Sequence, residues 1–217
     1  MKTAVIVTGG KIEELFVRSF LETHSYDYLI GVDKGIEFLK RESRIPTHIV
    51  GDFDSSSTDT LNWFRKKEEK VEIRTFLPEK DETDTQIAVD LAIELQCQTI
   101  YILGATGTRL DHMMGNLQIL SVPFHRGISC YLLDGHNRVQ LCSSYLKLKK
   151  EEQFGDYVSL IAHSERVTGI TLRGFYYPLL DAELDNKTTL GVSNKIVEKE
   201  AEIFVKTGEL FVIESKD

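Results

Sequence analysis

Short apolar runs alternate with helical patterns through the first part of the chain. Thr3–Val7 and Thr99–Leu103 are runs of strong strand formers, which indicates buried strands. Lys11–Glu22 and Leu110–Leu120 place apolar residues three and four positions apart, as an amphipathic helix does, and Met114 is expected to face the core. Strands that alternate with helices predict an α/β fold with a mostly parallel, Rossmann-like sheet.

The pattern changes after Pro123, where long helical periodicity is no longer found. Short strands separated by turn residues follow, and Ala201–Val205 and Glu209–Ile213 flank a Thr-Gly pair as the arms of a hairpin would. We therefore expect an α/β domain over residues 1–125 and an all-β domain over residues 126–217.

Composition narrows the class of protein. Of the 217 residues, 41% are hydrophobic and 28% are charged, which is ordinary for a globular chain. The net charge of −8 argues against nucleic acid or an anionic membrane as a partner, and no apolar run approaches membrane-spanning length. Cys97, Cys130 and Cys142 are odd in number and show no Cys-x-x-Cys spacing, which favours free thiols in the cytoplasm.

Acidic residues recur where predicted strands pass into helices. Asp52 and Asp54 follow an apolar pair and are separated by one residue, so both carboxylates can point the same way. A turn followed by a helix cap would explain this run equally well. However, Asp81, Asp84 and Asp111 lie at other such junctions, and these junctions meet at one edge of a parallel sheet. Mg²⁺ prefers oxygen ligands of this kind.

A glycine-rich turn, Gly104–Arg109, feeds the helix that starts at Leu110. Backbone N–H groups at a helix start, together with Arg109, could bind phosphate oxygens, while Asp111 could hold a metal ion. The segment is not a Walker A loop, because no Gly-Lys-Ser/Thr follows. Near the other acidic residues, Thr83 and Gln86 have the spacing of a capping box, so helix capping alone can explain that pair.

Several sequence blocks, read together, resemble one known family. They are Gly51-Asp-Phe-Asp-Ser, Lys80-Asp-Glu-Thr-Asp-Thr-Gln, Gly104-Ala-Thr-Gly-Thr-Arg-Leu-Asp-His, Gly174-Phe-Tyr-Tyr-Pro-Leu and Gly191-Val-Ser-Asn. In this order they resemble the thiamine pyrophosphokinases in their bacterial form. The resemblance implies an ATP:thiamine diphosphotransferase that has an α/β catalytic domain and a β-sandwich domain. It also implies a homodimer that binds thiamine between its subunits.

The resemblance also implies roles for individual residues. The expected Mg²⁺ ligands are Asp52, Asp54, Asp81 and Asp111, and with Asp84 these form the expected catalytic set. The residues expected at ATP and its phosphates are Asp33, Thr106, Gly107 and Arg109. The residues expected at thiamine are Gln86, Ser193 and Asn194. Either Asp84 or Asp81 is expected to accept the proton of the thiamine hydroxyl.

The chemistry of the residues agrees with this assignment. The thiamine hydroxyl would attack the β-phosphorus of ATP, with AMP as the leaving group, and such transfers depend mainly on positioning and charge neutralisation. One alternative is a different Mg²⁺-dependent phosphoryl or nucleotidyl transferase, which would leave most of the blocks unexplained. Another is a non-catalytic sensor of thiamine diphosphate or metal. A sensor could lose acidic residues, yet all of them are present.

Overall fold

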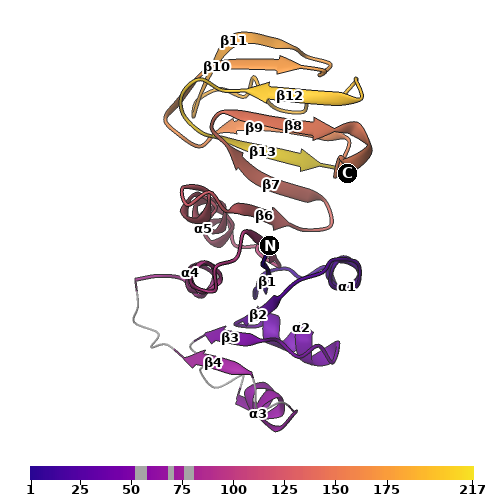
Figure 1. Cartoon of the computed structure of the whole chain (residues 1–217), viewed down its shortest axis with the longest axis vertical. Coiled ribbons are helices and arrows are strands. Elements are labelled where there is room, and N and C mark those ends of the chain that lie inside the picture. Colours follow the sequence, from indigo (N-terminus) through magenta and orange to yellow (C-terminus); the bar gives the residue numbers. More distant parts are fainter. Residues whose placement is uncertain (52–57, 68–70, 76–80) are drawn as a thin grey trace. The chain divides into compact units, whose positions relative to one another are not determined.

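The computed structural model describes residues 1–51, 58–67, 71–75 and 81–217. The chain divides into two compact units, Met1–Gly135 and His136–Asp217 (Figure 1). The first unit continues past the boundary expected near residue 125, because a strand that follows this point, β6, pairs in parallel with β5. The roles expected for the two domains remain proposals.

The first unit is built on a parallel sheet with strand order β4-β3-β2-β1-β5-β6. The strands are β1 (Thr3–Val7), β2 (Tyr28–Val32), β3 (His48–Gly51), β4 (Glu72–Thr75), β5 (Thr99–Leu103) and β6 (Ser129–Leu133). The central strands are almost entirely buried, as expected of a parallel sheet that has helices on both faces. This confirms the predicted α/β fold.

Helices connect these strands. They are α1 (Glu14–Thr23), α2 (Gly35–Arg41), α3 (Thr58–Lys67), α4 (Asp84–Glu94), α5 (Leu110–Ile119) and the short α6 (Ser121–Phe124). In Figure 1, α1 and α2 lie on one side of the strands of this unit and α4 lies on the other. α2 packs against β2 and α3, whereas α4 packs against β1, β2 and β3. In the described ranges, no helix has both the length and the apolar character needed to cross a membrane.

The carboxyl ends of the parallel strands meet at one edge of the sheet. Val7 at the end of β1 pairs with Gly31 in β2 and with Leu103 at the end of β5. Leu103 in turn pairs with Leu133 at the end of β6. The loops that follow these strands therefore start side by side, and we call this border of the sheet the carboxyl edge.

The second unit contains antiparallel strands in two sheets. The strands are β7 (Asn137–Cys142), β8 (Tyr145–Lys149), β9 (Tyr157–Ala162), β10 (Arg166–Arg173), β11 (Leu179–Asp185), β12 (Glu200–Phe204) and β13 (Leu210–Ser215). One sheet has the order β7-β13-β9 and the other the order β11-β10-β12-β8. A 3₁₀ turn, Lys150–Glu152, follows β8.

Both sheets of the second unit contribute to one apolar core. Val158 and Leu160 from β9 lie in the same buried cluster as Ile170 and Leu172 from β10. This arrangement is the predicted β-sandwich. The hairpin expected from the last two strands is wrong, however, because β12 pairs with β8 and β10 while β13 pairs with β7 and β9. The turn at Gly208 carries the chain from one sheet to the other.

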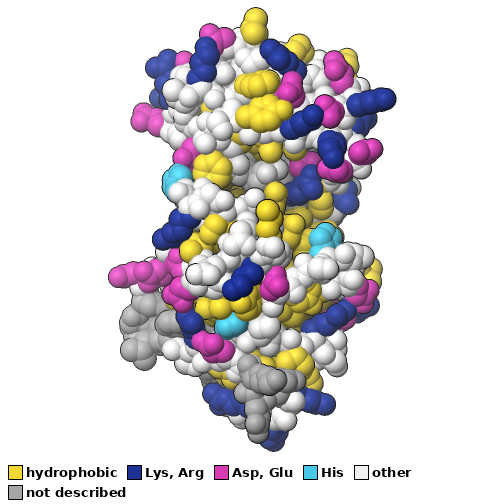
Figure 2. Space-filling model, in the orientation of Figure 1, with side chains coloured by type: hydrophobic (Ala, Val, Ile, Leu, Met, Phe, Trp, Pro, Cys, Tyr) yellow, Lys and Arg dark blue, Asp and Glu magenta, His cyan; other side chains and the backbone are white. Residues whose placement is uncertain are grey.

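Large hydrophobic side chains remain on the surface of both units (Figure 2). Met114, expected in the core, is 61% exposed, and Leu110 one turn earlier on α5 is 67% exposed. The prediction for Met114 is wrong because the buried side of α5 is formed by Asn116 and Ile119. Apolar periodicity identified the helix but gave the wrong orientation to its first turns.

Candidate active site at the carboxyl edge

The order of strands reverses between β1 and β5. Strands β2, β3 and β4 follow one another on one side of β1, and β5 and β6 lie on its other side. In open α/β sheets, ligands bind outside the carboxyl ends of the strands at such a switch point. Here the loop after β1 contains Gly9 and Gly10, and the loop after β5 contains Gly104–Arg109. The sequence therefore places its two glycine-rich turns where this fold binds ligands.

These two loops are joined by backbone hydrogen bonds. The N–H of Gly10 donates to the carbonyl of Gly104 at 2.8 Å, and the N–H of Lys11 donates to the carbonyl of Thr106 at 2.7 Å. A Cβ atom on Gly10 would lie 2.4 Å from the carbonyl oxygens of both Gly104 and Thr106, which real structures do not allow. Glycine is required at this position because the two backbones approach so closely.

The loop after β2 lies beside the same turn. A Cβ atom on Gly9 would be 3.0 Å from the backbone nitrogen of Lys34 and 3.2 Å from the Cβ atom of Asp33. Asp33, expected at the phosphates, has a φ of 47°, which is the left-handed region. Aspartate tolerates this conformation better than most residues, and non-glycine residues held in it tend to cluster at functional sites.

The first turn of α4 carries the next group of expected residues. Thr83 caps the helix, and its hydroxyl accepts a hydrogen bond from the N–H of Gln86 at 3.3 Å, as its capping spacing predicts. Asp84 is the first helical residue and is partly exposed, while Asp81 precedes the cap and is exposed. Carboxylates at this end of a helix interact favourably with its dipole.

The start of α5 holds an exposed ion pair. The Nε and Nη2 atoms of Arg109 donate to the two carboxylate oxygens of Asp111 at 3.1 Å and 2.5 Å. The hydrogen bonds from Arg109, and then one from the N–H of His112, lower the pKa of Asp111 to about 2. Asp111 is therefore ionised at neutral pH, as a cation ligand must be. A bound phosphate would compete with Asp111 for Arg109.

Carboxylate oxygen is the type of ligand that a hard cation such as Mg²⁺ prefers. Asp33, Asp81, Asp84 and Asp111 supply carboxylates, and Mg²⁺ commonly takes only one or two of these while it keeps water and phosphate oxygens. Within the described residues, no three His, Cys, Asp or Glu side chains are grouped closely enough to hold a metal ion. The expected ligands Asp52 and Asp54 lie outside the described residues and directly follow Gly51, the last residue of β3.

Asn194, expected at thiamine, is buried in the second unit and its side chain is engaged. Its Oδ1 atom accepts from the N–H of Tyr177 at 2.9 Å, and its Nδ2 atom donates to the carbonyl of Tyr177 at 2.8 Å. The amide thereby holds the turn that contains Tyr176 and Tyr177. Each of these residues is about three-fifths exposed, and their rings meet edge to face with centroids 4.8 Å apart. Both rings are therefore outside the core.

Ser193, the other residue expected at thiamine in this unit, is exposed. Its φ of 60° is also left-handed, and its N–H donates to the hydroxyl of Ser159 at 2.9 Å. The structure thus holds Ser193 on the surface, close in sequence to the amide that fixes the tyrosine turn. A role for either residue in binding thiamine stays a prediction.

Sequence reasoning missed buried polar residues that hold the loops of the carboxyl edge. The Nδ2 atom of Asn116, on α5, donates to the carbonyl of Ala105 at 2.7 Å, within the turn after β5. The hydroxyls of Thr8 and Thr85 lie 3.0 Å apart. A polar side chain inside an apolar helix face, as at Asn116, was the available signal, because buried polar groups need partners.

Comparison with known proteins identifies the family. The family model for the catalytic domain of thiamin pyrophosphokinase matches residues 21–132, and the model for its vitamin B1 binding domain matches residues 143–211. A curated relative, thiamine pyrophosphokinase of Bacillus subtilis (strain 168), is 34% identical over 220 residues and is covered over its whole length, as is this chain.

Solved structures agree with this assignment. The crystal structure of thiamine pyrophosphokinase from Bacillus subtilis matches with a TM-score of 0.87 at 33% identity, over all of both chains. The structure of thiamin pyrophosphokinase from Geobacillus thermodenitrificans matches with a TM-score of 0.83 at 28% identity, over all of this chain and 98% of the other. The chain therefore belongs to the thiamin pyrophosphokinase family, whose enzymes form thiamine diphosphate from thiamine and ATP.

Proposed function

We propose that this chain transfers the diphosphoryl group of ATP to the hydroxyl of thiamine at the carboxyl edge of its parallel sheet. The observation that carries this placement is the switch point between β1 and β5, where two glycine-rich loops are hydrogen-bonded to each other. The starts of α4 and α5 follow loops that leave the same edge. Backbone N–H groups and helix dipoles at such starts favour anions, and ATP supplies the anion.

Phosphate binding is assigned to the turn after β5 and to Asp33. Phosphate oxygens can approach the backbone of Thr106 and Gly107 closely. The guanidinium of Arg109 supplies paired donors that match phosphate oxygens. Arg109 is 68% exposed in its ion pair with Asp111, so it can reach a ligand without leaving a buried position. Asp33 lies beside this region next to Gly9.

Mg²⁺ is the proposed cofactor, held by Asp52, Asp54, Asp81 and Asp111. When bound, the ion would neutralise negative charge on the phosphate oxygens, which a chain of net charge −8 otherwise repels. Asp84, or Asp81 before it, would accept the proton of the thiamine hydroxyl. Asp84 suits this role because it sits in the first turn of α4 and keeps access to solvent.

Thiamine is assigned to Gln86, Ser193 and Asn194. Gln86 lies in the same first turn of α4 as Asp84. A residue proposed to bind thiamine is therefore close to the residue proposed to accept the proton of the thiamine hydroxyl. In the second unit, Asn194 holds the backbone of Tyr177, in a turn that carries two exposed tyrosines, and Ser193 directly precedes Asn194 in the sequence. A cationic ring such as that of thiamine is attracted to aromatic faces.

The products of the reaction test this proposal. With ATP, thiamine and Mg²⁺, the purified protein is expected to release one AMP for each thiamine diphosphate formed, as measured by chromatography and phosphorus NMR. Chelation of divalent cations with EDTA should abolish turnover, and added Mg²⁺ should restore it. Formation of ADP with thiamine monophosphate would contradict the diphosphoryl transfer, and tight binding without turnover would favour a sensor.

We also propose a cytoplasmic homodimer. The cysteines are free and buried, which is typical of a reducing compartment. Both units carry exposed hydrophobic side chains, a feature of surfaces that meet other proteins. They include Leu110, Met114, Tyr176, Tyr177, Leu180 and Leu190. Sedimentation equilibrium is expected to give twice the mass of the chain at micromolar concentration, and a monomer at this concentration would overturn the assembly.

A further inference from the structure

Two buried threonines connect the end of β1 to the start of α4. Thr8 directly follows β1 and is 4% exposed, and Thr85 is the second residue of α4 and is 6% exposed. Their Oγ1 atoms lie 3.0 Å apart, so one hydroxyl donates to the other. Removing a hydroxyl from water is unfavourable unless it gains a partner, and here each provides that partner.

Thr8 is itself held firmly by the loops of the carboxyl edge. Its N–H donates to the carbonyl of Leu103, the last residue of β5, at 2.9 Å. The residues that follow it, Gly10 and Lys11, donate to the turn after β5. Thr8 is therefore tied to the two glycine-rich loops by backbone hydrogen bonds, and its hydroxyl connects these loops to Thr85 on α4.

Thr85 lies between the two residues of α4 that have proposed roles at the reacting centre. Asp84 precedes it and Gln86 follows it, and both are only partly buried. Because the three residues share one helical turn, the position of the Thr85 side chain determines where its neighbours point. A hydrogen bond is directional, so it fixes this turn more tightly than apolar contact does.

We propose that the hydrogen bond between Thr8 and Thr85 positions the first turn of α4 against the loops of the carboxyl edge during diphosphoryl transfer. The two threonines are thus positioning residues that act through Asp84 and Gln86, so the inference rests on the proposed site. A misplacement of about 1 Å can lower turnover about a hundredfold, so a small shift of this turn has a measurable effect.

The test is the double variant Thr8→Val with Thr85→Val, which removes both hydroxyls and leaves neither unpaired. Valine has nearly the shape of threonine, so the fold is expected to be retained by circular dichroism. We expect kcat to fall about tenfold or more, with a smaller change in the KM for ATP. Thr85→Ser keeps the hydroxyl and is expected to retain most of kcat.

The matched control is Thr60→Val in α3. Thr60 is also buried, at 2% exposure, and its hydroxyl accepts from the Nζ atom of Lys40 at 3.2 Å, a residue with no proposed role at the site. This variant is expected to keep the kcat of the parent protein. An equal fall in kcat for Thr60→Val would show a general effect of lost buried hydroxyls and would overturn the proposal.

Two further outcomes are decisive. A double-valine variant with unchanged kcat, or one that does not fold, would overturn the positioning role.

Asp84→Asn tests the underlying site separately, since it removes the proposed proton acceptor and leaves the threonines in place. If Asp84→Asn is inactive while the double-valine variant is fully active, the site stands and the positioning role is wrong. If Asp84→Asn is fully active, Asp84 is not the proton acceptor, and the positioning role that acts through Asp84 loses its basis.

Discussion

Replacing Arg109 with glutamine is expected to lower kcat by about 10²- to 10³-fold at saturating ATP and thiamine, because the transferred phosphates would lose a charged donor. The free energy of unfolding is expected to stay close to that of the parent protein, since exposed ion pairs contribute little to stability. The Arg109 and Asp111 side chains are 68% and 65% exposed. Steady-state kinetics and urea denaturation measure the two quantities.

Arg126 offers a matched control in the same unit. It is also exposed and ion-paired, with its Nη1 atom 3.8 Å from the Oδ1 atom of Asp90. It follows α6 and precedes β6, so it lies toward the opposite end of the strands from the carboxyl edge. Arg126→Gln should keep full activity. If Arg109→Gln behaved in the same way, the loop after β5 would lose its assigned role in phosphate binding.

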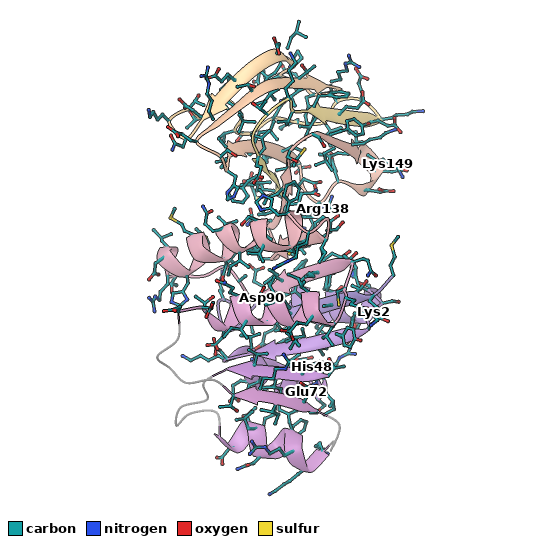
Figure 3. The ribbon with its side chains drawn as sticks, turned by 60° about the vertical axis from the view of Figure 1, so that its left-hand side comes forward. Lys2, His48, Glu72, Asp90, Arg138 and Lys149 are labelled. Carbon is teal, nitrogen blue, oxygen red and sulfur yellow. The ribbon has the colours of Figure 1, made fainter. Side chains whose placement is uncertain are left out.

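Arg138→Met is expected to lower the free energy of unfolding of the second unit by about 3–5 kcal/mol, because it leaves a buried charge without its partner. Arg138 on β7 and Glu214 on β13 are directly paired across the sheet. The Nε and Nη2 atoms of Arg138 donate to the two carboxylate oxygens of Glu214 at 2.7 Å and 2.8 Å, and Glu214 is fully buried. The side chain of Arg138 is labelled in Figure 3.

The Glu214 carboxylate also orders the segment before β9. It accepts a third hydrogen bond, from the N–H of Phe154 at 3.1 Å, and Arg138 donates to the carbonyl of Glu152 at 3.3 Å. Loss of Arg138 should therefore increase hydrogen exchange in residues 150–156 as well as in β7 and β13. Fluorescence of the single tryptophan, Trp63, follows the first unit and serves as an internal reference.

Arg166→Met is the control for burial. Arg166 on β10 also makes a two-fold hydrogen-bonded pair, with Glu183 on β11, but these side chains are 66% and 45% exposed. Because solvent screens this pair, its loss should change the free energy of unfolding far less than the loss of Arg138 does. Equal destabilisation by Arg138→Met and Arg166→Met would mean that burial of Glu214 does not set the strength of its pair.

Local patterns predicted the elements more accurately than they predicted their neighbours. The strand Thr3–Val7 and the cap at Thr83 were found as expected, since both depend on residues close in sequence. The final hairpin was not found, because two strands joined by a turn can enter different sheets of a sandwich. That choice depends on contacts such as those of β12 with β8, which are distant in sequence.

The exposed residues of α5 illustrate the same limit. Periodicity in Leu110–Leu120 predicted the helix, but Met114 faces solvent while Asn116 is buried. The reason is the hydrogen bond from Asn116 to Ala105, which turns a polar residue toward the sheet. A partner in another loop cannot be read from the hydrophobic pattern of the helix itself.

By itself, the sequence determined the class of fold, the family and the residue types available for chemistry, because motif spacing and strand–helix alternation are properties of short segments. The tertiary structure decided which loops meet. It hydrogen-bonds Gly10 to Gly104, Thr8 to Thr85, and the side chain of Asn194 to the backbone of Tyr177. These contacts link segments far apart in the chain, and they form only when the strands take their places in the sheets.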